Sequence, residues 1–205
     1  MRDGIVLQLQ SEALDENTDV ESLLRKAYVV ASKLKLDDFK EWITCEQNGY
    51  TDKRPNYRFV KGEIKARNAH GRFIPVLFPS NISDKINTIP IDDPISTVID
   101  LYSSSKNPLY FSLSSQFNEF LISKTTATFH TFYFETSTSS MHNIISAVRN
   151  TVLEWALNLE KNGIVGGHLC FSDNEIKNAQ NVNTINYYTN NFYSSVEHTH
   201  IDQGN

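Results

Sequence analysis

The sequence has few cysteines and no long apolar run. Cys45 and Cys170 are its only cysteines, and neither has a second thiol close by in the sequence. We therefore expect two reduced thiols in a reducing compartment. The segment from Ile5 to Leu7 is too short for the core of a signal peptide, and no stretch approaches the ~18 apolar residues of a membrane span. The expected location is the cytoplasm.

An excess of basic residues is also missing. The chain has 24 acidic and 19 basic side chains and a net charge of −5, which argues against general coating of nucleic acid. The patterns GxSxG, HExxH and GxGxxG do not occur, and Gly166-Gly167-His168 lacks the lysine of a phosphate-binding loop. Conventional nucleotide or hydrolase chemistry is therefore not predicted, and we expect no cofactor.

Helical patterns fill both ends of the first 180 residues. Apolar residues at helical spacing predict helices over about 3–15, from the Thr18-x-x-Glu21 capping box to Leu34, and from Asp37 to Asn48-Gly49. A long helix is predicted from about Ser139 to Gly163, and Ser172-x-x-Glu175 predicts the start of a short one. The long helix is apolar over much of its circumference, which is typical of a buried central helix.

All six prolines lie between Pro55 and Pro108, and this middle region predicts a sheet. Residues 57–66 and 127–135 are expected strands, residues 68–71 a turn, and residues 72–78 an edge strand because of Pro75. Residues 92–94 predict a helix start, and residues 112–123 fit a helix or a strand. The predicted fold class is α+β, with N-terminal helices and a long central helix packed on a small, mostly antiparallel sheet. We expect one domain over residues 1–180 and a β-prone tail over residues 181–205.

One short pattern is typical of metal-dependent nucleases. Glu63 and Lys65 lie two residues apart on a predicted strand, with Asp52 upstream. In such enzymes two carboxylates hold Mg²⁺ and the lysine orients water. The same short pattern occurs at Asp38 and Lys40 inside a predicted helix, so a charged strand face is the alternative.

Basic residues are concentrated between Arg54 and Arg72, where six of them accompany one acid, Glu63. With aromatic neighbours, such a segment can bind phosphates and stack on bases. The candidate nucleic-acid contacts are Arg58, Lys61, Lys65, Arg67 and Arg72. The alternative is a solvated edge strand that its charges protect from aggregation.

Arg149 lies on the otherwise apolar long helix and should be paired, because an unpaired buried charge is costly. Glu41, Glu46 and Glu154 are its candidate partners in a structural ion network. His198 and His200 have the spacing of metal ligands on a strand, but no third ligand follows at suitable spacing, so no metal site is predicted.

The last 25 residues combine asparagine with aromatic residues. Such segments order when identical copies stack. The tail is therefore predicted to form an added strand on its own sheet or to pack against another copy. The candidate oligomerisation residues are Tyr187, Tyr188, Phe192 and Tyr193.

Two helical blocks resemble a known family. "LLRKAYVVASKLKLDDFKEWITCEQNGY" (23–50) and "ISAVRNTVLEWALNLEKNGI" (145–164) are similar to the two signatures of the AbiTii domain of bacterial abortive-infection proteins. The family-like positions are Arg25, Glu41, Trp42, Asn48, Gly49, Tyr50, Arg149, Trp155, Glu160 and Gly163. The resemblance implies anti-phage defence and names no active site and no cofactor.

Three functional hypotheses follow from the residues and the resemblance together. The first is a defence protein that acts through homo-oligomeric assembly without conventional catalysis. The second is a nucleic-acid-binding or metal-dependent nuclease effector that uses the basic segment. The third is a regulatory partner of another toxin, bound to a second defence-system protein.

Overall fold

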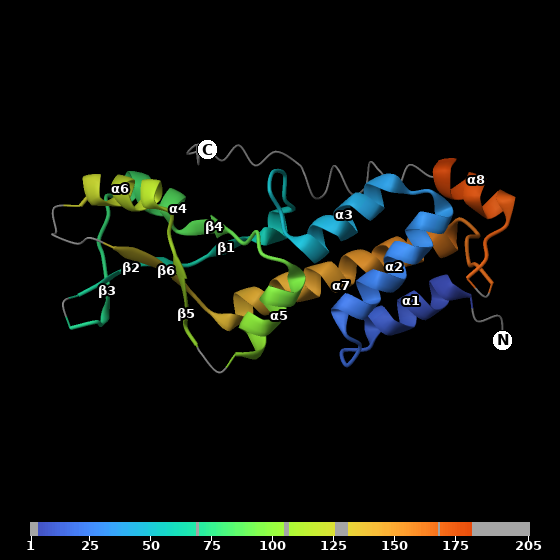
Figure 1. The fold of residues 1–205 in the computed structure, drawn as a ribbon, viewed down its shortest axis with the longest axis horizontal. Coiled ribbons are helices and arrows are strands. Elements are labelled where there is room, and N and C mark those ends of the chain that lie inside the picture. Colours follow the sequence, from blue (N-terminus) through green and yellow to red (C-terminus); the bar gives the residue numbers. More distant parts are fainter. Residues whose placement is uncertain (1–3, 69, 105–106, 126–130, 168, 182–205) are drawn as a thin grey trace.

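Helices form one end of the molecule and a small sheet forms the other. A computed structural model describes residues 4–68, 70–104, 107–125, 131–167 and 169–181. Figure 1 shows an elongated arrangement in which the helix α7 (Thr138–Lys161) starts beside the sheet and runs the length of the helical end. The predicted α+β class is confirmed. Apart from Asn181, the predicted tail, including the four oligomerisation candidates and the histidine pair, lies outside the described residues.

The helical end consists of α1 (Ile5–Leu14), α2 (Val20–Leu34), α3 (Asp37–Asn48), α7 and α8 (Asp173–Asn181). The three predicted N-terminal helices are present. The cap of α2 differs from the prediction, because the Asp19 side chain accepts from the Ser22 N–H at 2.8 Å. α3 ends as predicted at Asn48, and Gly49 follows with a φ of +94°, a conformation that glycine adopts without steric cost.

The long helix α7 is the common packing partner of this end. It contacts α1, α2 and α5 (Ile95–Ser103) and buries Val148, Val152 and Trp155 completely. Its prediction as a buried central helix is confirmed. Each such buried apolar side chain stabilises the fold by about 2 kcal/mol relative to its exposure to water.

The main sheet has four antiparallel strands in the order β3-β2-β6-β5. These are β2 (Glu63–Arg67), β3 (Phe73–Pro75), β5 (Leu109–Ser112) and β6 (Phe132–Thr136). β3 is an edge strand, as Pro75 predicted, and the turn before it is built on Asn68, whose side chain accepts from the Arg72 N–H at 2.9 Å.

The strand predicted over residues 57–66 is wrong as a single element. It begins as the 3₁₀ turn η1 (Asn56–Arg58) and is then divided at Gly62. Its first part, β1 (Phe59–Lys61), pairs with β4 (Thr88–Pro90) in a separate two-stranded sheet. Gly62 lies so close to β6 that a Cβ there would be 2.2 Å from the Glu135 carbonyl oxygen.

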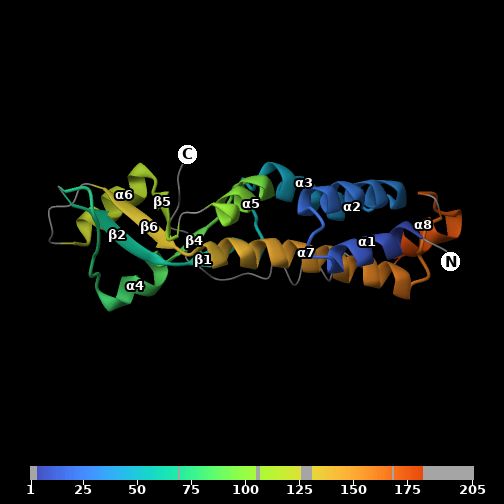
Figure 2. The ribbon, with the colours of Figure 1, turned by 90° about the horizontal axis from the view of Figure 1, so that it is seen from below.

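The remaining helices cover one face of the main sheet. α4 (Ser80–Ile86) was not predicted, and α6 (Ser115–Ser123) resolves the ambiguous segment as a helix. Both lie above the sheet in Figure 1, whereas Figure 2, seen from below, shows β2 and β6 with no helix in front of them.

Pro94 is the residue before α5 rather than its first residue.

Candidate functional site

A buried polar network joins α3 to the segment that leads into the sheet. Glu46 on α3 and Arg58 of η1 form an ion pair, and both side chains are fully buried. Arg58 Nη1 also donates to the Asp93 carbonyl at 2.8 Å and to the Ile91 carbonyl at 3.3 Å. The guanidinium therefore links three separate segments of the chain.

Two tyrosines also donate hydrogen bonds to the Glu46 carboxylate. The hydroxyls of Tyr50 and Tyr57 donate to Glu46 Oε1 at 2.5 and 2.6 Å, and Trp42 Nε1 donates to the Tyr57 hydroxyl at 2.9 Å. Burial and the nearby Glu46 carboxylate raise the pKa of both tyrosines far above its usual range. Both phenols therefore remain protonated hydrogen-bond donors.

A second ion pair lies at the edge of this network. Arg54 and Asp92 form an ion pair at 2.5 Å, and the Tyr50 N–H donates to the Asp92 carbonyl at 2.8 Å. Burial raises the pKa of Asp92, and the Arg54 charge opposes that effect. Because Glu46 and Arg58 have no exposed surface, the network serves to hold the two ends of the molecule together rather than to contact a substrate.

Arg149 has backbone partners, and the prediction that it pairs with Glu46 is wrong. Its guanidinium donates to three backbone carbonyls, those of Glu12 at 3.2 Å, Asp15 at 2.9 Å and Thr18 at 2.7 Å. Glu46 forms an ion pair with Arg58 instead. Arg149 thus satisfies two carbonyls at the end of α1, a role that cations commonly have at helix C-termini, and one in the connection to α2.

The structure gives the predicted nuclease residues no metal-binding arrangement. Glu63 and Lys65 lie on the same face of β2 and pair with one another at 2.6 Å, and Lys65 also lies 3.4 Å from Glu135. Asp52 lies in the loop after α3. Within the described residues, no three histidine, cysteine or acidic side chains come together as a metal site would require.

The five basic residues that were predicted to contact nucleic acid lie in three different environments. Arg58 is buried in the network, so its prediction as a phosphate contact is wrong. Lys65 is paired with two carboxylates. Lys61, Arg67 and Arg72 are exposed, and none of them has a carboxylate within ion-pair distance in the described part of the chain.

Aromatic side chains lie on the face of the main sheet that α4 and α6 leave uncovered. Phe73 of β3 stacks on Tyr110 of β5 with ring centroids 3.8 Å apart, and Tyr133 of β6 meets Phe73 edge-on at 5.1 Å. Alternation along the strands puts Lys65 and Arg67 on the same face. Sequence reasoning missed these aromatics, although the outward positions of the aromatic strand 127–135 were a signal for Tyr133.

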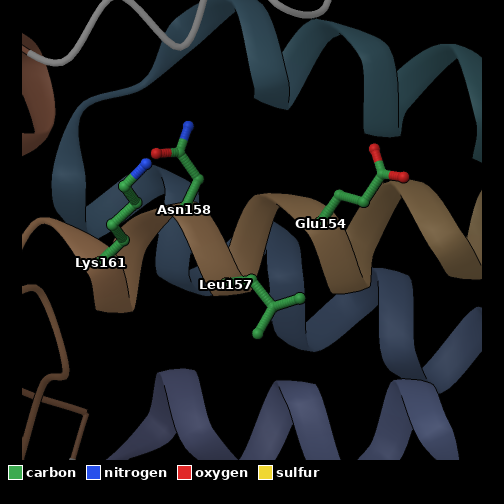
Figure 3. A pocket seen from close by; sticks show the side chains of 4 residues that line it. All are labelled: Glu154, Leu157, Asn158 and Lys161. Atoms are coloured by element: carbon green, nitrogen blue, oxygen red, sulfur yellow. The ribbon is translucent and has the colours of Figure 1, made fainter.

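A second feature, a hollow on α7, has little capacity to bind a ligand. It has a volume of about 380 Å³ and is lined by Glu154, Leu157, Asn158 and Lys161. All four residues belong to one helix, and Figure 3 shows Leu157 pointing to the other side of α7 from the remaining three. The open face of the sheet, from here on the surface of Lys65, Arg67, Phe73, Tyr110 and Tyr133, is therefore the candidate site.

Comparison with known proteins identifies the family. The model of the AbiTii family matches residues 4–184, which is most of the chain. This chain belongs to the AbiTii family. Neither the curated proteins nor the solved structures contain a match.

AbiTii is a family of abortive-infection proteins, so the match supports a role in anti-phage defence. Two of the AbiTii-like positions, Trp42 and Tyr50, belong to the buried network, and a third, Gly49, has the positive φ at the end of α3. The described helices include none that is long and apolar enough to cross a bilayer.

Proposed function

We propose that this AbiTii protein defends bacteria against phage by abortive infection and that it acts as a homo-oligomer. Copies associate by strand addition at the outer edge of β5, and the β-prone tail beyond α8, residues 182–205, supplies the added strand. The defence role rests on family membership. The mode of association rests on the chemistry of the sheet edges.

The observation that carries the mechanism is the contrast between the two edges of the main sheet. The edge strand β3 ends at Pro75, which has no N–H to donate, and follows the charged Arg72. The other edge strand, β5, has the sequence Leu-Tyr-Phe-Ser, which contains no proline and no charge, and its nearest proline, Pro108, lies directly before it. An uncharged edge strand presents unpaired N–H and C=O groups to any strand that approaches it.

The tail has the composition of such a strand. Its aromatic residues, Tyr187 and Tyr188 followed by Phe192 and Tyr193, favour β-structure and lie among polar residues. Addition of an extended segment to a sheet edge is a common mode of association, in which main-chain hydrogen bonds provide the affinity.

Light scattering of the purified protein tests this mechanism. We expect the full chain to have the mass of a defined oligomer, and a chain that ends at Asn181 to be a monomer. Ser112→Asp should also give a monomer, because it puts a charge on the exposed end of β5. Ser139→Asp is the matched control, since Ser139 is exposed at the start of α7, where an acid is compatible with the helix.

A monomeric full chain would overturn the proposed assembly. A full chain that is monomeric, harmless to cells and recovered bound to a second defence protein would favour the regulatory alternative. If truncation gives a monomer but Ser112→Asp leaves the oligomer intact, the tail binds at a site other than β5.

A further inference from the structure

We propose that the open face of the sheet binds single-stranded nucleic acid. Its aromatic rings stack on bases, and Arg67 and Arg72 contact phosphates. This inference does not rest on the proposed oligomerisation, because base stacking uses side chains on a face of the sheet, whereas strand addition uses the main-chain groups of β5.

The aromatic residues form a platform that a base can extend. Phe73 and Tyr110 are stacked with an interplanar angle of only 10°, and Tyr110 is 38% exposed. The Glu135 carboxylate raises the pKa of Tyr110, and the stack on Phe73 holds the Tyr110 ring in place. A held, partly exposed ring loses little conformational freedom when a base stacks on it, and every base has a face that can stack.

The charges around the platform suit a polyanion. Lys65 lies within ion-pair distance of both Glu63 and Glu135, so these three side chains leave one net negative charge, which the two arginines outweigh. Arg67 is the cross-strand neighbour of Phe73 and lies on this face, whereas Arg72 lies at the edge of the sheet, directly before β3. Both arginines are exposed, and neither has a carboxylate within ion-pair distance in the described ranges. The protein as a whole carries a charge of −5, so binding should be restricted to this surface.

The platform favours single strands over duplexes. In a duplex the base faces are stacked on one another, so they are not available to a protein ring, whereas unpaired bases can be placed on aromatic side chains. Phosphates alone would be contacted equally in both forms. A preference for single strands is therefore the signature of stacking.

Fluorescence anisotropy with the full-length protein tests the proposal. The probes are fluorescein-labelled 12-nucleotide RNA and DNA of mixed sequence, and the corresponding duplexes, at low and moderate salt. We expect both single strands to bind more tightly than the duplexes, and the RNA and DNA arms to show whether the sugar matters. Tyr110→Ala should weaken binding at least about fivefold, whereas Tyr110→Phe retains the ring and should bind like the wild type.

The double variant Arg67→Ala/Arg72→Ala should weaken binding and reduce the slope of log K against log salt by about 1.4, since each phosphate contact contributes ~0.7 for a single strand. Lys33→Ala/Lys177→Ala, at exposed lysines of α2 and α8, makes the same change in net charge and should have no effect. Circular dichroism melting verifies that each variant folds. The proposal is overturned by absence of binding at low salt, by equal binding of duplexes, or by equal losses in the arginine and lysine variants.

Discussion

At the scale of single residues, Glu46 explains most about how this fold is held. Its carboxylate accepts from Arg58 and from two tyrosine hydroxyls in a site without exposed surface. The sequence contained a signal for it, because Glu46 continues the apolar spacing of Phe39, Trp42 and Ile43 along α3. An acid within an apolar stripe must find a partner, but its spacing does not say which one. That is why Arg149 rather than Arg58 was predicted to pair with it.

Loss of Arg58 should be among the most damaging single changes. Arg58→Met leaves the buried Glu46 carboxylate without its counter-charge, so we expect the free energy of unfolding to fall by about 3–5 kcal/mol in urea denaturation. Adding Glu46→Gln should recover part of this loss, because the amide oxygen still accepts from the tyrosines and carries no charge. Strictly additive losses in the double variant would contradict the coupling described here.

Glu175 should make stability depend on pH in acid. Although burial alone would raise its pKa, hydrogen bonds from the N–H groups of Ser172, Gly166 and Val165 lower it from 4.5 to about 2. Its folded pKa is below the unfolded one, so its contribution is complete above about pH 4.5 and is lost as the pH falls towards 2. We expect Glu175→Gln to cost about 1–2 kcal/mol at pH 6, after allowance for solvent screening.

Urea unfolding of wild type and Glu175→Gln at pH 6, 4 and 3 would measure this directly. The difference between the two proteins should shrink with falling pH, because protonation makes Glu175 resemble glutamine. A difference that stays constant over this range would show that the charge is unimportant.

At the scale of elements, Gly62 decides where one strand becomes two. A side chain there would meet the Glu135 carbonyl oxygen at 2.2 Å and the Phe134 ring at 2.5 Å. We expect Gly62→Ala to destabilise the protein by about 3 kcal/mol or more, as severe overpacking does. Gly167→Ala is the matched control, since a Cβ at Gly167 has no neighbour within 4 Å, and it should change stability by less than about 0.5 kcal/mol. Equal melting temperatures for both variants would show that Gly62 does not set this boundary.

Elements with a long periodic pattern could be predicted, and short ones could not. The stripe of α7 and the Ser172–Glu175 capping box gave correct helices, because both signals are local. β4 has only three residues and exists through its pairing with β1 across 27 or more positions of sequence. Its residues carry no alternating pattern of their own, so its place depends on tertiary contacts that a sequence does not display.

At the scale of the whole molecule, the candidate site is assembled from segments far apart in the chain. Phe73, Tyr110 and Tyr133 come from three strands, and only the order β3-β2-β6-β5 puts them on one face. The sequence indicated the arginines through their clustering but not the rings. It also grouped Arg54 and Arg58 with them, although the fold uses both in the junction between the helices and the sheet. The clustering of basic residues in the sequence therefore indicated roughly where the candidate site lies, and the strand order determines which residues belong to it.

In the proposed mechanism, this AbiTii protein protects a bacterial population through its assembled form. The most direct measurement is a challenge of cells that express the wild type, Ser112→Asp or Ser139→Asp at equal levels with a panel of phages, counting plaques and surviving infected cells. We expect the wild type and Ser139→Asp to reduce plaques against at least one phage while infected cells die, and Ser112→Asp to give no protection. Full protection by a Ser112→Asp protein that is monomeric in solution would contradict this mechanism.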